Sequence, residues 1–145
     1  MSSDADFGRA WAACLVASLG ESLPGDAFGQ VMQQCGRKCA RTHAAKLIEG
    51  AKGSVDALLD AFGKDVGPEN ATREGDELHL RYPQCYCPMV SAVEDPLPPQ
   101  YCECGRGFVL EAFSAVASKP VAVELVGSIK RGGSTCHFII KTASA

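Results

Sequence analysis

Two Cys-x-Cys pairs stand close together in the second half of the chain, Cys85 with Cys87 and Cys102 with Cys104. Each pair brings two sulfur atoms to one side of a tight turn or strand. Four thiolates at about 2.3 Å from the ion would complete the closed tetrahedral shell of a structural zinc site. The proline-rich segment 96–99 stiffens the connection between the pairs and lowers the entropy lost on ordering it. We therefore predict a zinc site, with an iron–sulfur cluster as the alternative because it also needs four thiolates.

A second group of metal-ligating residues lies upstream, where Cys35, Cys39 and His43 are each four residues apart. On one continuous helix they form a single stripe, and neighbours on that stripe are close enough to bind one ion. Gly36 favours a helix end at Cys35, in which case Cys39 and His43 still stay paired. Joined to one Cys-x-Cys pair, this group provides a second route to a four-ligand site. The alternative for Cys35 and Cys39 is a purely structural role.

From their spacing alone, we expect the other cysteine and histidine side chains to have no chemical role. Cys14 lies on an apolar helix face, where it is expected to be a small core residue. Cys136 points with Phe138 to one face of a strand, which also favours core packing. His79 and His137 alternate with apolar strand residues, so both are expected to be solvated.

Length and composition limit the class of protein. The 145 residues fit one domain, residues 1–145, with room for a sizeable core. A net charge of −3 without a basic stripe predicts no nucleic-acid partner. The Met1 end lacks a signal-like pattern and no apolar stretch approaches about 20 residues, so we expect a cytoplasmic protein without a membrane partner. In that reducing compartment, eight cysteines indicate metal binding or catalysis rather than disulfides.

The pattern of apolar residues divides the chain into a helical part, residues 1–66, and a part with strands, residues 67–145. Helical spacing predicts four helices in the first part, with Ser54 as the N-cap of the last. A turn is expected at 73–76. The elements expected after it are a strand at 78–82, a helix at 105–117, and a hairpin of strands 121–129 and 135–141. The expected fold class is α+β, a helical N-terminal half packed on an antiparallel sheet.

The segment CECGRGFVLEAFSAVASKPVAVELVGSIKRGGSTCHFIIK, residues 102–141, resembles the 4-vinyl reductase domain. Shared features are a Cys before a Gly-aromatic helix start, a strand carrying Glu124, a Gly-rich hairpin, and a final Cys-x-Phe strand beginning at Cys136. The resemblance implies a small-molecule-binding module with a fold like that of TRAPP vesicle-tethering subunits, and it allows a homodimer. In some members cysteines and a glutamate of this motif hold zinc.

Carried over to this sequence, the resemblance makes Cys102 or Cys104, together with Glu124 and Cys136, possible zinc ligands. The chain departs from the pattern after the glutamate, where the family's cysteine is replaced by Gly127-Ser128. The additional pair of Cys85 and Cys87, which lies outside the usual motif, would replace the lost ligand.

A looser resemblance links the chain to small bacterial proteins grouped around an aminothiazoline-carboxylate hydrolase. The shared elements are the Cys-x-Cys-Pro at Cys85 and the Cys-x-Cys-x-x-Gly at Cys102. This resemblance implies an enzyme, a hydrolase that acts on a cyclic amide or thiazoline. A cysteine nucleophile needs a base, and His43 is the only histidine near a cysteine-rich segment, so Cys39 and His43 are the residues to test for these roles. Whether the protein is an enzyme stays open at this stage.

Taken together, these patterns favour a cysteine-coordinated, metal-containing domain of the small-molecule-binding or sensor type. The small-molecule ligand would lie in a pocket lined by four aromatic side chains: Trp11, Phe28, Phe108 and Phe113. The alternatives are the hydrolase and an iron–sulfur or thiol redox protein, in which close thiols cycle between dithiol and disulfide.

Overall fold

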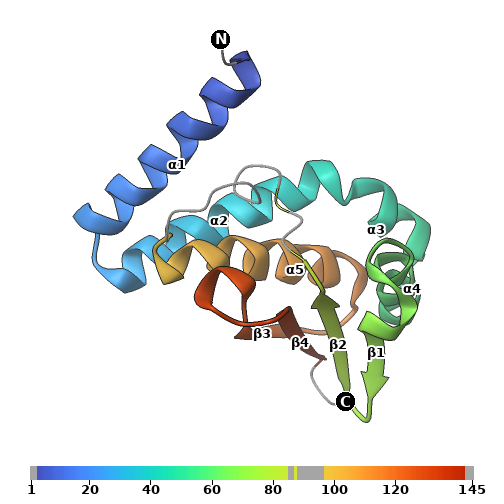
Figure 1. Cartoon of the computed structure of the whole chain (residues 1–145). Helices are drawn as coiled ribbons and strands as arrows, with labels where there is room; N and C mark the ends of the chain where they lie inside the picture. Colours follow the sequence, from blue (N-terminus) through green and yellow to red (C-terminus); the bar gives the residue numbers. More distant parts are fainter. Residues whose placement is uncertain (1–2, 85–86, 88–96, 143–145) are drawn as a thin grey trace.

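The computed structural model describes residues 3–84, 87 and 97–142, and within them the chain forms five α-helices and one four-stranded sheet (Figure 1). The α-helices are α1 (Asp4–Ser22), α2 (Gly25–His43), α3 (Ala45–Ala51), α4 (Val55–Val66) and α5 (Glu103–Val116). The strands are β1 (Ala71–Glu74), β2 (Glu77–Tyr82), β3 (Val121–Gly127) and β4 (Cys136–Thr142). Three short 3-10 turns are η1 (Pro68–Asn70), η2 (Pro99–Cys102) and η3 (Ile129–Arg131). The predicted α+β class, with a helical N-terminal half, is confirmed.

The sheet is antiparallel with strand order β1-β2-β4-β3. Alternation along β2 and β4 directs Leu78, Leu80, Phe138 and Ile140 to one face, where all four are buried. Leu80 lies opposite Phe138 and Leu78 opposite Ile140 in the β2–β4 register, so the two strands together form the floor of the core. The helices α4 and α5 cover this face.

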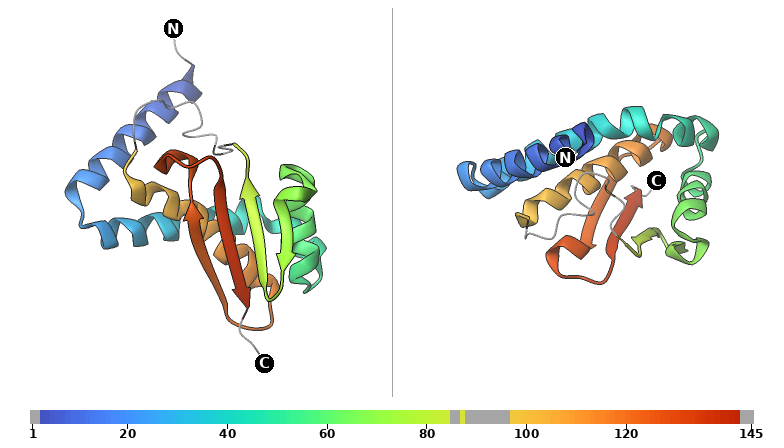
Figure 2. Two further views of the ribbon diagram at one scale, coloured as in Figure 1. Left: turned by 60° about the horizontal axis from the view of Figure 1, so that its bottom comes forward. Right: turned by 45° about the horizontal axis from the view of Figure 1, so that its top comes forward.

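The helices form a second and a third layer over the sheet, with α5 lying between α2 and the strands (Figure 2, right). On the sheet side, Phe113 and Val109 of α5 are buried in the main core. On the other side, α5 crosses α2 so closely that a Cβ added at Gly36 would overlap the carbonyl oxygen of Cys104. The same crossing places the backbone of Gln33 against Gly107. Glycine on each helix therefore lets two backbones meet.

An ion-pair clamp holds the same two helices together one turn further along. The Nε atoms of Arg37 and Arg41 on α2 each donate to the Glu111 carboxylate of α5, both at 2.8 Å. These two hydrogen bonds, Arg41 first, hold the pKa of Glu111 below its usual value.

Several predicted boundaries are wrong. Gly36 does not end a helix, because α2 continues to His43, and a separate short helix, α3, begins at Ala45. The turn predicted at 73–76 is the β1–β2 hairpin, so β1 was missed. By contrast, the Ser54 N-cap is confirmed: its hydroxyl accepts a hydrogen bond from the Ala57 N–H at 3.1 Å.

The helix α1 extends away from the other layers (Figure 1) and has no buried residue. Cys14 lies on it and is exposed, so the prediction that it packs in the core is wrong. Phe7 and Trp11 are 69% and 59% exposed. Even so, none of the helices that the structure describes is long and apolar enough to cross a bilayer.

Candidate functional site: two groups of thiols

Cys35 and Cys39 lie one turn apart on α2 and are both exposed. The continuous helix gives them the single stripe that their spacing predicts. Cys104 belongs to the first turn of α5 and lies across the helix crossing, where its carbonyl oxygen meets Gly36. Because Gly36 follows Cys35 directly, the close backbone contact brings Cys104 to the α2 thiols.

The electrostatics show that four thiols are neighbours. Burial and the negative charge of Cys35, Cys87 and Cys39 raise the pKa of Cys104 to about 12, and a hydrogen bond with Cys35 contributes. Burial also raises the pKa of Cys39, with Cys35 and Cys87 as the next causes. We call these four residues the α2–α5 thiol cluster. Adding negative charge to any one of them is opposed by the others.

Cys87 joins this cluster from the segment that follows β2. Its sulfur lies 3.2 Å from the phenolic oxygen of Tyr101, which belongs to η2 and is buried. Cys87, Cys104 and Tyr101 all take part in a small second core around Phe28 and Met32. The cluster therefore draws sulfur atoms from three separate parts of the chain.

The donor set of this cluster suits a soft metal ion, because thiolates favour Zn²⁺, Cu⁺ and iron–sulfur clusters. In the described structure, however, the thiols of this cluster are not arranged as a closed coordination shell. Among residues 3–84, 87 and 97–142, no three or more Cys, His, Asp or Glu side chains are arranged to hold an ion. The described part of the cluster is thus a group of neighbouring thiols, two of them at the surface.

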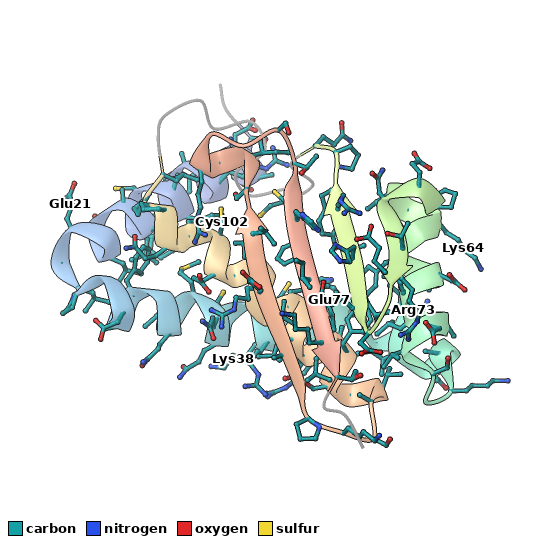
Figure 3. All side chains as sticks on the ribbon, turned by 90° about the horizontal axis from the view of Figure 1, so that it is seen from below. Glu21, Lys38, Lys64, Arg73, Glu77 and Cys102 are labelled. Atoms are coloured by element: carbon teal, nitrogen blue, oxygen red, sulfur yellow. The ribbon has the colours of Figure 1, made fainter. Side chains whose placement is uncertain are left out.

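A different group forms on the sheet side of α5. The sulfur of Cys102 lies 2.8 Å from the hydroxyl oxygen of Ser128, and the sulfur of Cys136 lies 4.0 Å from the same oxygen. The backbone N–H of Ile129 points at the Cys136 sulfur at 3.5 Å. Figure 3 labels Cys102 at the beginning of α5. We call Cys102 and Cys136, which both contact Ser128 just before η3, the η3 thiol pair.

The model of one family matches residues 7–145, nearly the whole length of the sequence. The chain belongs to the DUF6144 family. That family is described only as one of unknown function. No curated protein and no solved structure matches the chain.

In this DUF6144 chain the predicted ligands fall into separate places. Cys102 and Cys104 both pack against the second core, but the Cys102 sulfur contacts Ser128 whereas Cys104 lies beside Cys35. Cys85 lies outside the described residues. Glu124 is exposed on β3 opposite Ile139, on the sheet face away from the helices, whereas Cys136 packs against the core. His43, the last residue of α2, is exposed one turn beyond Cys39.

The four aromatic residues of the predicted pocket are not brought together either. Phe28 and Phe113 are buried in two different core clusters. Phe108 packs edge-to-face on Phe62 of α4, and Trp11 is exposed on α1. Two shallow depressions among the described residues lie elsewhere, one at the α4 side of β1 and one near the end of β4.

The sequence reasoning missed a polar network on the sheet face that no described helix covers, the face carrying Glu77 in Figure 3. His79 is only 6% exposed, so the expectation that it is solvated is wrong. Its Nε2 lies 3.2 Å from carboxylate oxygens of Glu74 and Glu77, and its Nδ1 lies 2.8 Å from Nε2 of His137. The cross-strand register, which places Thr72, His79 and Ile139 side by side, creates this network, and no local signal in the sequence announces it.

Proposed function

We propose that the protein binds one soft metal ion, zinc in the first instance, through the α2–α5 thiol cluster of Cys35, Cys39, Cys87 and Cys104. The observation that carries this proposal is the close contact of α2 and α5 at Gly36, which places Cys104 beside Cys35 and Cys39, with Cys87 packed against the same small core. The raised pKa of Cys104, caused by burial and by these three thiols, agrees with that placement. Four neighbouring thiols whose thiolate forms repel one another are stabilised by a divalent cation, because each thiolate then gains an attractive interaction with the ion.

Binding would tie together three parts of the chain. Two ligands come from α2, one from the first turn of α5, and one from the segment after β2. Cys35 and Cys39 are exposed, so their side chains have room to turn toward Cys104 and Cys87 when an ion enters. Four thiolates make a closed shell, which is the property of a structural zinc site rather than a catalytic one. The proposal requires reduced thiols, as in the cytoplasm.

The hydrolase alternative has less support from the same residues. A cysteine nucleophile acts as the thiolate and needs a lowered pKa. Burial raises the pKa of Cys39, and that of Cys104 rises to about 12. His43, the base in that alternative, is exposed at the end of α2.

Metal analysis of protein purified without oxygen tests the proposal. We expect about one zinc ion per chain in the wild type, and its loss in Cys104→Ser, because the buried ligand anchors the ion. Cys14→Ser is the matched control, since Cys14 is exposed on α1 and belongs to neither thiol group. Broad visible absorption with bound iron would assign the cluster to iron and sulfur instead. Wild-type protein that binds neither metal, or Cys104→Ser with an unchanged zinc content, would overturn the proposal.

A further inference from the structure

The η3 thiol pair is built around a serine that is removed from solvent. Ser128 is 1% exposed, and its hydroxyl lies within 4.0 Å of the sulfurs of both Cys102 and Cys136. Its backbone is fixed by the η3 turn, where the N–H groups of Arg131 and Gly133 donate to the Ser128 carbonyl at 3.1 and 2.8 Å. The hydroxyl therefore has a defined position between two sulfurs that are 34 positions apart in the sequence.

This arrangement differs from ordinary packing of cysteine in a core. Burying a hydroxyl costs free energy unless it is hydrogen-bonded, and this one is directed to sulfur. The Cys136 sulfur also accepts the Ile129 N–H, so it is held by polar contacts as well as by the core. An alanine at position 128 would fill the site without a polar group to satisfy. The polar contacts instead orient two thiols toward one point.

We propose that Cys102 and Cys136 are a reversible oxidation site that forms an intramolecular disulfide. The oxidant is a low-molecular-weight disulfide of the glutathione class. One thiol of the pair, as thiolate, attacks the oxidised glutathione, forms a mixed disulfide and releases one glutathione thiol. The second thiolate attacks the protein sulfur of that mixed disulfide and releases the other glutathione. The two cysteines lose two electrons and two protons, and one glutathione disulfide becomes two thiols.

The pairing follows from the position of α5. Cys104 is turned toward α2, where its backbone meets Gly36, while Cys102 is turned toward Ser128 and β4. The new bond would join the beginning of α5 to β4, next to an existing contact in which the Arg131 Nε donates to the Pro99 carbonyl at 2.6 Å. This proposal does not depend on metal binding, because neither member of the pair belongs to the α2–α5 thiol cluster.

Disulfide mapping of the full-length wild-type protein tests the proposal. The protein is incubated with oxidised glutathione, alkylated, and digested without reduction. Trypsin alone leaves Cys85, Cys87, Cys102 and Cys104 in one peptide, so a glutamate-specific protease is added; it cuts after Glu94 and Glu103 and isolates Cys102. We expect a peptide pair linking Cys102 to Cys136, lost again on treatment with dithiothreitol, and metal content is measured in parallel.

Two variants sharpen the result. Cys136→Ser should stop the reaction at the mixed disulfide, with glutathione retained on Cys102, and Cys14→Ser should form the bond as the wild type does. Circular dichroism checks that Cys136→Ser is folded, and the wild-type map decides the matter if it is not. A bond from Cys102 to Cys85 or Cys104, or a Cys136 that is alkylated in full after oxidation, would overturn the proposal.

Discussion

Replacing Gly36 with alanine adds one methyl group where α2 and α5 meet. The new Cβ would overlap the carbonyl oxygen of Cys104 and lie 2.8 Å from the backbone nitrogen of Phe108. Both atoms belong to the backbone, so no side-chain rotation relieves the contact. Carbon atoms pack best at about 3.5–4.0 Å, and the two helices would therefore have to separate by roughly 1 Å or more.

The free-energy change of this substitution has two opposing parts. Overpacking a tight site costs about 1–3 kcal/mol, and the rigid backbone on the far side places Gly36→Ala near the upper end of that range. Alanine gains about 1 kcal/mol over glycine in a helix. We expect the free energy of unfolding to fall by about 2 kcal/mol, which is a shift of about 1 M in the urea midpoint at an m-value of ~2 kcal/mol/M.

The matched control is Gly50→Ala on α3, where no heavy atom lies within 4 Å of the added Cβ. That variant should be as stable as the wild type or more stable, because it receives the gain in helix propensity without the clash. Urea unfolding followed by far-UV circular dichroism measures both variants. A Gly36→Ala protein as stable as Gly50→Ala would refute the claim that the backbones touch at this crossing.

Three further predictions concern single side chains. Glu111→Gln should lower the free energy of unfolding by about 0.5–1 kcal/mol at neutral pH; the loss is small because both arginine partners are partly exposed. Urea titrations should show that the difference between variant and wild type fades as the pH falls through the depressed pKa of Glu111. Burial, Arg81 and His79 lower the pKa of His137 below 6.5, so near this pH the unfolded chain binds more protons than the folded chain. Wild-type stability, measured as the urea midpoint, should therefore drop as the pH falls below about 6.5, and His137→Gln should flatten this decline. Ser54→Ala should cost about 1 kcal/mol in thermal unfolding, and Ser54→Asp should keep most of the wild-type stability.

The helical half was predictable because its signals are local. A serine N-cap followed by an apolar stripe defined α4, and the four-residue spacing of Cys35 and Cys39 requires only that the helix be continuous. Gly36 was misread because glycine serves two purposes, ending a helix or letting another backbone approach. Only the partner helix, which lies about 70 residues further along the chain, decides between them.

The separation of Cys102 from Cys104 has a geometric reason. Cys102 and Cys104 were treated as two sulfurs on one side of a turn, but the helix begins at Glu103 rather than at residue 105. Cys102 therefore ends η2 while Cys104 lies in the first turn of α5, and the chain turns between them so that the Cys102 sulfur contacts Ser128 whereas Cys104 lies beside α2. His79 was misjudged similarly, because its burial comes from neighbours on β1 and β4 that local alternation does not reveal.

The position of α5 between two layers connects its packing with its chemistry. Cys104 has a short side chain, and it lies half-buried beside Cys35 and Cys39 because Gly36 lets the helices touch. If the crossing opens, Cys104 gains solvent and moves away from its neighbours, and both changes lower its pKa from about 12. Gly36→Ala should therefore make Cys104 react faster with a thiol-specific alkylating reagent, while Cys102, held by Ser128 on the other side of α5, should react as before. A stability loss without this selective change would mean that the two helices separate elsewhere than at the thiols.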